Sequence, residues 1–180
     1  GHQFRLPVWL KGQLRPSWGP LRDDFPILLE DPQGCRRYVG IVIEGVEIKP
    51  SPASMAERLT HLGIRPINNV VDATNFCLME LGQPFHAFDL DRLEGSQIHV
   101  RLSRAGETLK LIDATTCSLT PEFLVIADEK KPVALAGVMG GQETEIGPQT
   151  KRILLEAAWF DPRKIRRATF RTKLTSDSSY

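Results

Sequence analysis

Cysteine is scarce in this chain of 180 residues, and its three copies, Cys35, Cys77 and Cys117, lie far apart. No CxxC or CxxH spacing occurs among them, so the sequence favours neither a disulfide framework nor a zinc site. An odd number of separated thiols is typical of proteins from a reducing compartment. We therefore expect a cytoplasmic protein without a bound metal.

An excess of charge of one sign and long apolar runs are also lacking. Lysine and arginine number 23 against 22 aspartate and glutamate residues, which leaves a net charge of +1. This balance gives no general attraction to nucleic acid or to a membrane, so any such contact must be local. No apolar run approaches the ~18 residues of a membrane span, and the start lacks the order of a signal peptide. We expect no membrane association.

Proline is concentrated at the start of the chain. The segment before Ile27 is too rich in proline for a regular helix or a central strand, with Pro7, Pro16, Pro20 and Pro26. We interpret residues 1–36 as an extended arm or the remnant of a preceding module. Residues 37–180 are long enough to form one domain with its own core.

Apolar residues at helical spacing predict about three helices. The first segment, 51–63, has Ser51 as its cap and Pro52 at the first helical position. The second segment, 69–82, ends at a glycine. The third segment, 161–174, begins with Asp161 as a cap, followed by a proline.

Strands are predicted in the rest of the chain. The segment 36–48 alternates and is rich in β-branched residues, with a turn near Gly45. Further short apolar runs between turn residues occupy 96–102, 107–113, 122–128, 132–141 and 152–160. Because strands and helices do not alternate as in βαβ units, the order favours an α+β fold with layered mixed or antiparallel sheets.

Polar residues near the second helix are ambiguous by themselves. In "LGQPFHAFD", His86 lies between Phe85 and Phe88, which is more typical of a packed core histidine than of a catalyst. Thr74 and Asn75 fall within the helix and are as consistent with a solvent-facing position as with a site.

The segment "AGVMGG" follows a predicted strand and is rich in glycine. Ala136, Gly137, Gly140 and Gly141 would let a ligand or another chain approach the backbone closely. The lysine and hydroxyl of a Walker motif are absent, and the spacing is not GxGxxG. Nucleotide binding through this loop is therefore not favoured.

Glu156 stands out because it lies in a strand that is apolar on both faces. In "RILLEAAWF", one face would carry Leu154 and Ala158 with Glu156, and the other face is entirely apolar. A buried carboxylate is costly unless it is paired or hydrogen-bonded. Glu156 therefore needs a cation, a hydrogen-bond donor or a ligand that supplies one, and a structural ion pair is nearly as well supported as a ligand site.

The stretch from Arg163 to Lys173 is basic. It holds six basic residues and no acidic one. A solvated helix face explains much of this pattern, and a contact with a phosphate backbone is the alternative.

Several blocks of the sequence resemble a known family. They are "GIRPINNVVDATNFCLMELGQPFHAFDLDRLEG", "LVIAD", "ALAGVMGG", "ILLEAAWFDP" and "SDSS". In this order and spacing they closely resemble the editing module, the B3/B4 tRNA-binding domain, of the bacterial phenylalanine-tRNA ligase beta subunit. The resemblance runs from "ILLEDPQGCRRYVG" to the last residue, and the arm before residue 27 matches nothing in that family.

The resemblance implies a hydrolase within a ligase. The family's enzyme is a heterotetramer of two alpha and two beta subunits that uses ATP and Mg²⁺, whereas the beta module itself needs no cofactor. Its partners would be phenylalanine tRNA, the alpha subunit and the rest of the beta subunit, with no DNA. The module would hydrolyse tyrosine wrongly attached to phenylalanine tRNA.

The family's site residues map onto this chain one by one. Glu156 matches the glutamate that contacts the phenol hydroxyl, and Ala136 and Gly137 match the backbone that lines the pocket. His86, Thr74 and Asn75 match the polar end of the site near the ester, where we expect them to take part in hydrolysis. Two further positions, Ser176 and Ser178, align with a Thr-x-Ala/Ser segment at the border of the pocket. Ser176 keeps the hydroxyl of the family's threonine and lacks its methyl group.

Two other functions remain open at this point. The chain stops at "SDSSY", where the family's sequence continues, so the main alternative is a non-catalytic tRNA- or subunit-interaction module of the beta chain. A freestanding deacylase that edits in trans is the other alternative.

Overall fold

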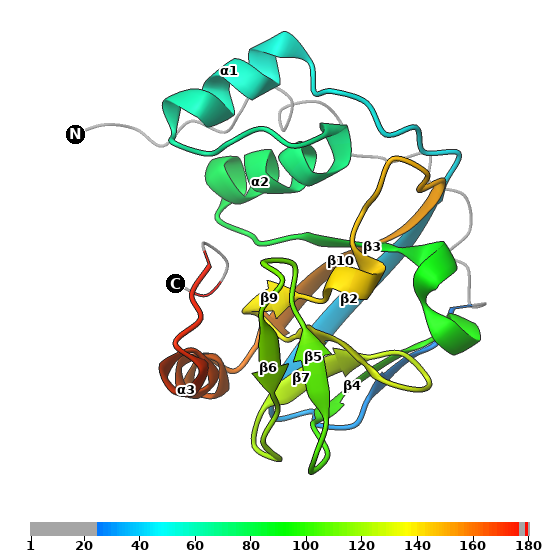
Figure 1. Ribbon diagram of the computed structural model, residues 1–180, viewed down its shortest axis with the longest axis vertical. Helices are drawn as coiled ribbons and strands as arrows, with labels where there is room; N and C mark the ends of the chain where they lie inside the picture. Colours follow the sequence, from blue (N-terminus) through cyan, green and yellow to red (C-terminus); the bar gives the residue numbers. More distant parts are fainter. Residues whose placement is uncertain (1–24, 177–178, 180) are drawn as a thin grey trace.

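The computed structural model describes residues 25–176 and residue 179 (Figure 1). Most of the proposed Pro-rich arm, up to residue 24, and Ser178 lie outside the described residues. Within the described part, the α-helices are α1 (Ala53–His61), α2 (Asn69–Leu81) and α3 (Pro162–Thr172). None of them is long and apolar enough to cross a membrane.

The strands form two larger sheets and a hairpin. Their bounds are β1 Ile27–Leu29, β2 Cys35–Glu44, β3 His86–Asp89, β4 Ile98–Leu102, β5 Thr108–Lys110, β6 Thr116–Ser118, β7 Leu124–Ala127, β8 Pro132–Leu135, β9 Met139–Gly140 and β10 Arg152–Phe160. One sheet has the order β1-β4-β7-β8-β9 and is antiparallel except for the parallel pair β1–β4; the other, β2-β10-β3, is antiparallel. The α+β class is therefore confirmed.

The two larger sheets pack face to face. Strand β10 contributes side chains from both of its faces to hydrophobic clusters. Leu154 of β10 joins Phe88 of β3 in a cluster with Ile98, Val100, Leu124, Ile126 and Val133 of the five-stranded sheet. On its other face, Ile153 packs in a second cluster with Val70 and Val71 of α2. The apolar character of both faces of this strand thus has a direct structural cause.

The far side of the five-stranded sheet carries α3 and the β5–β6 hairpin. Val125 and Leu135 pack there against Ile165 and Ala168 of α3, in a cluster that also contains residues of the hairpin. The molecule is therefore layered, with α1 and α2 on one side, then the two sheets, then α3 and the hairpin (Figure 1). This order brings α3 close to the end of β10, from which it directly follows.

Capping residues fix the ends of two helices as the sequence predicts. Gly82, in the left-handed conformation with φ 69°, ends α2, and the Asp161 carboxylate accepts from the amide of Arg163 to begin α3. The predicted start of α1 is wrong. Pro52 flanks the helix rather than occupying its first position, and the Ser51 hydroxyl donates to the buried carboxylate of Asp72 instead of capping.

Candidate functional site

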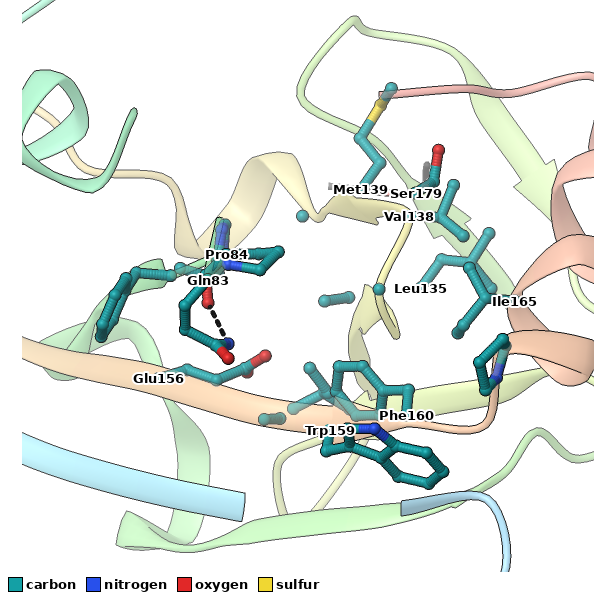
Figure 2. A pocket seen from close by; sticks show the side chains of 18 of the residues that line it. Gln83, Pro84, Leu135, Val138, Met139, Glu156, Trp159, Phe160, Ile165 and Ser179 are labelled. Atoms are coloured by element: carbon teal, nitrogen blue, oxygen red, sulfur yellow. Dashed lines mark hydrogen bonds between the residues drawn. The ribbon is translucent and has the colours of Figure 1, made fainter. Parts of the chain in front are cut away.

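A cavity of about 680 Å³ opens at one end of the space between the two sheets. Four pieces of the chain form most of its walls: the segment 82–86, the end of β10, the turn between β8 and β9, and the start of α3. Figure 2 shows Gln83, Pro84 and Glu156 at one end of the cavity, with Leu135, Phe160 and Ile165 toward the other. The end near Glu156 is thus polar, whereas the end near α3 combines apolar side chains with Arg163 and Arg166.

Glu156 lies in the cavity wall and is only 6% exposed. The hydroxyl of Tyr38 donates a hydrogen bond of 2.7 Å to its Oε2 atom. Within the described residues no cation contacts Glu156, and its Oε1 atom has no hydrogen-bond partner. The partner required by the sequence argument is therefore a hydroxyl donor, not an ion pair, and one carboxyl oxygen is left for a ligand.

Burial controls the protonation of this pair. Loss of solvent raises the pKa of Glu156 to about 7, and the hydrogen bond from Tyr38 acts in the opposite direction. Burial, together with the neighbouring Glu156, raises the pKa of Tyr38 well above its ordinary value. The phenol of Tyr38 therefore keeps its proton at neutral pH and remains a donor.

His86 lies directly opposite Glu156 in the β3–β10 register. Its ring meets the edge of Phe88 with 4.4 Å between centroids and an interplanar angle of 76°. Gly140 covers the ring from the other sheet, since a Cβ atom there would lie 2.6 Å from His86 Cε1. Burial lowers the pKa of His86 to about 4, so the imidazole is neutral at pH 7. It makes no hydrogen bond to any described residue.

The glycine-rich turn after β8 serves both packing and the cavity. Gly137, with φ +66°, lines the cavity, and a Cβ there would lie 2.9 Å from Ile165 Cδ1. Gly140 also lines the cavity, whereas a Cβ at Gly141 would meet the carbonyl oxygen of Val133. Ala136 is buried behind this wall in the core between the sheets. Close backbone approach is therefore needed by the fold itself at these glycines.

The remaining sequence-predicted residues lie less close to the cavity. Thr74 and Asn75 are partly buried within α2 and are not among the lining residues; the Thr74 hydroxyl donates to the carbonyl of Val71. The Ser176 hydroxyl donates to the carbonyl of Val138 at 2.6 Å, which attaches the end of the chain to the turn. Ser179, which accepts from the amide of Ser176, lines the cavity.

Several lining residues were not singled out from the sequence. Trp159 is 44% exposed at the cavity and lies 5.1 Å, from ring centroid to guanidinium, from Arg36. Arg163 and Arg166 of α3 also line it. The predicted basic stretch was the signal for the arginines, whereas the position of Trp159 near the end of β10, opposite Arg37 of β2, depends on the strand register.

Comparisons with known proteins agree with this architecture. Residues 34–180 match the family model for the B3/4 domain. The chain belongs to the B3/4 domain family. The chain is 50% identical over 153 residues to a phenylalanine-tRNA ligase beta subunit of Carboxydothermus hydrogenoformans, which covers 85% of this chain and 19% of that protein. It is 48% identical over 180 residues to that of Anaeromyxobacter dehalogenans, or 100% of this chain and 22% of that protein.

A solved structure has the same fold as this B3/4 domain. It is an N-terminal fragment of the phenylalanyl-tRNA synthetase beta subunit from Pyrococcus horikoshii, with a TM-score of 0.56 and 10% identity, over 86% of this chain and 50% of that one. The chain spans about a fifth of the length of the two bacterial relatives. In the described residues, no group of three or more His, Cys, Asp and Glu side chains is placed to hold a metal ion.

Proposed function

We propose that the cavity hydrolyses the ester between tyrosine and phenylalanine tRNA. The observation that carries the proposal is Glu156, a buried carboxylate with one oxygen held by Tyr38 and the other without a partner, at the wall of a cavity. The relatives' name, phenylalanine-tRNA ligase beta subunit, supplies the context. Within such a ligase the partners are phenylalanine tRNA, the alpha subunit and the rest of the beta subunit, in a two-alpha two-beta assembly in the cytoplasm.

A second site of this kind has a clear physical purpose. Tyrosine is phenylalanine with one added hydroxyl, and an apolar pocket rejects such an addition only by roughly a hundredfold. A site that hydrogen-bonds the hydroxyl favours tyrosine by ~10⁴ to 10⁵ in the best cases, because phenylalanine leaves its polar groups unpaired. Glu156 supplies that acceptor, and the apolar end of the cavity accommodates the ring.

The reaction is attack of water on the ester carbonyl, with cleavage of the bond to the ribose oxygen and release of free tyrosine. Negative charge develops on the carbonyl oxygen, and the backbone amide of Gly137 is the donor in the turn after β8 that can stabilise it. The neighbouring amides of Val138 and Gly141 already donate to the carbonyls of Leu135 and Val133. His86, neutral at pH 7, orients the water or accepts a proton from it, a role that the ribose hydroxyl of the tRNA shares. The step needs no ATP and no metal ion.

Deacylation assays test the proposal. The two substrates are tyrosine and phenylalanine, each attached to phenylalanine tRNA. Glu156→Ala should abolish the preference for the tyrosyl ester over the phenylalanyl ester, while Glu145→Ala, which removes an exposed carboxylate, should leave this preference intact. Because Glu156→Ala also leaves the Tyr38 hydroxyl without an acceptor, Glu156→Gln serves as a second variant that keeps an acceptor for Tyr38. Undiminished tyrosine selectivity in both Glu156 variants would refute the assignment.

One observation favours a non-catalytic function instead. Thr74 and Asn75, which the resemblance places near the ester, are not among the residues that line the cavity. A module that only binds tRNA, or that only contacts other subunits, needs neither residue near the cavity. An absence of tyrosyl-tRNA hydrolysis, with tRNA affinity retained, would favour this alternative over an editing domain or a freestanding deacylase.

A further inference from the structure

Helix α3 divides its basic side chains between two environments. On one flank, Lys164 pairs with Asp31 at 2.6 Å, and both Arg167 and Arg171 pair with Glu122. On the flank that lines the cavity, Arg163 and Arg166 are exposed and have no acidic partner among the described residues. Two uncompensated cations are therefore concentrated at the cavity, although the whole chain carries a net charge of only +1.

An exposed aromatic ring accompanies these cations. Trp159 lines the same cavity and is 44% exposed, and the Arg36 guanidinium lies 5.1 Å from its ring centroid. Guanidinium groups bind phosphate oxygens with well-defined geometry. Cations beside a solvent-exposed ring are typical of sites that bind single-stranded nucleic acid, in which bases stack while phosphates are neutralised.

We propose that Arg163, Arg166 and Trp159 form a binding surface for the single-stranded 3′ end of an RNA. The two arginines contact its phosphates, and the indole of Trp159 stacks on a base, so that the last nucleotide enters the cavity. This inference rests on the proposed function, because the ester to be hydrolysed is carried by that nucleotide. Because α3 follows β10 directly, the two elements place the arginines and the Glu156 carboxylate at one cavity.

A binding assay measures the affinity of this surface for RNA without requiring hydrolysis. The probe is a short single-stranded RNA with the sequence of the tRNA acceptor end, labelled with fluorescein at its 5′ end and titrated with the 180-residue chain. The double variant Arg163→Gln/Arg166→Gln should weaken binding at least tenfold at low salt. It should also reduce the slope of log affinity against log salt by about 1.4, at ~0.7 per phosphate contact.

The same helix provides a matched control. Arg167→Gln/Arg171→Gln removes two positive charges from the flank paired with Glu122 and should change affinity by less than about twofold. Trp159→Ala should weaken binding about tenfold and Trp159→Phe much less, because a phenyl ring still stacks. An equal loss in both double variants, or competition by hexaglutamate as strong as by unlabelled RNA, would overturn the proposal in favour of general charge or an acidic peptide.

Deacylation kinetics separate this inference from the proposed function. If the wild-type chain binds the RNA through these residues but does not hydrolyse tyrosyl-tRNA, the surface stands and the editing function fails. If it hydrolyses tyrosyl-tRNA with a KM unchanged by Arg163→Gln/Arg166→Gln, the editing function stands and the surface fails. When both hold, Arg163→Gln/Arg166→Gln raises the KM for tyrosyl-tRNA at least tenfold. The same variant leaves the KM for tyrosyl-adenosine, which lacks phosphates, nearly unchanged.

Discussion

Tyr38 on β2 donates a 2.7 Å hydrogen bond to Glu156 on β10, and the two strands pair so that Tyr38 lies opposite Ala158. The two side chains are therefore diagonal neighbours on the face that meets the other sheet. The bond fixes the carboxyl group and satisfies Oε2, while Oε1 keeps its capacity to accept. Glu156 is thus held ready for a ligand hydroxyl at a cost that depends on pH.

We expect Glu156→Gln to stabilise the fold at alkaline pH. Burial raises the pKa of Glu156 to about 7, so ionisation is harder in the folded chain than in the unfolded chain. The stability from this group is fully present below its unfolded pKa and is lost as pH rises from that value through about 7. The loss in unfolding free energy amounts to about 3 kcal/mol at pH 8. The midpoint of thermal unfolding should be nearly equal to wild type at pH 5 and several degrees higher at pH 8.

The control for this prediction is Glu145→Gln, which neutralises an exposed carboxylate. Its unfolding midpoint relative to wild type should be the same at both pH values, because the group is solvated in both states. A parallel pH dependence in the two variants would show that net charge, and not the burial of Glu156, causes the effect. The gain in the Glu156 variant is expected to accompany a loss of tyrosine selectivity, as is common where a functional group is buried.

Tyr38→Phe should raise the pKa of Glu156 further and weaken tyrosine selectivity at neutral pH. The phenol hydroxyl is the donor that opposes the effect of burial, and without it the ionised carboxylate loses its partner. The cost should be about 1–3 kcal/mol of unfolding free energy above pH 7. Urea unfolding of both single variants and of Tyr38→Phe/Glu156→Gln measures the coupling, and strict additivity would contradict a direct interaction.

The sequence predicts the regular elements far better than the pairings between them. Capping residues and periodicity give α2, α3 and β10 almost to their observed bounds. Strands β1, β3 and β6 were missed because segments of three or four residues carry too little periodic signal. They are strands only because distant segments pair with them.

The candidate site shows the same limit. The apolar strand around Glu156 predicts that a donor is needed, but nothing local identifies Tyr38, which is 118 residues away along the chain. Only the β2–β10 register brings the two together. Thr74 and Asn75 are close to His86 in sequence, and yet α2 holds them away from the cavity lining because the helix packs on the opposite face of the sheet.

Gly137→Ala should destabilise the fold more than the same change at Gly63. Both glycines have a positive φ, of +66° and +80°, but an added Cβ would meet Ile165 and Phe160 at Gly137 and nothing within 4 Å at Gly63. Backbone strain alone should cost about 1 kcal/mol at Gly63, whereas added overpacking should bring the total at Gly137 to about 2–4 kcal/mol. Chemical unfolding measures both, and equal losses would show that Gly137 serves backbone conformation only.

Gly140→Ala should act through His86. An added Cβ would lie 2.6 Å from His86 Cε1 and 2.8 Å from Nε2, so the imidazole must move, while the ring of Phe88, 4.4 Å away between centroids, limits that movement. We expect a loss of about 1–3 kcal/mol in the wild-type background from overpacking. In a His86→Ala background the space is free and the loss should nearly vanish, so the double-mutant cycle should give a coupling of about 1–2 kcal/mol.

Deacylation rates should follow the same pattern: each single variant slows hydrolysis moderately, and the double variant is no slower than His86→Ala. Independent, additive effects on both stability and rate would show that Gly140 does not position the imidazole.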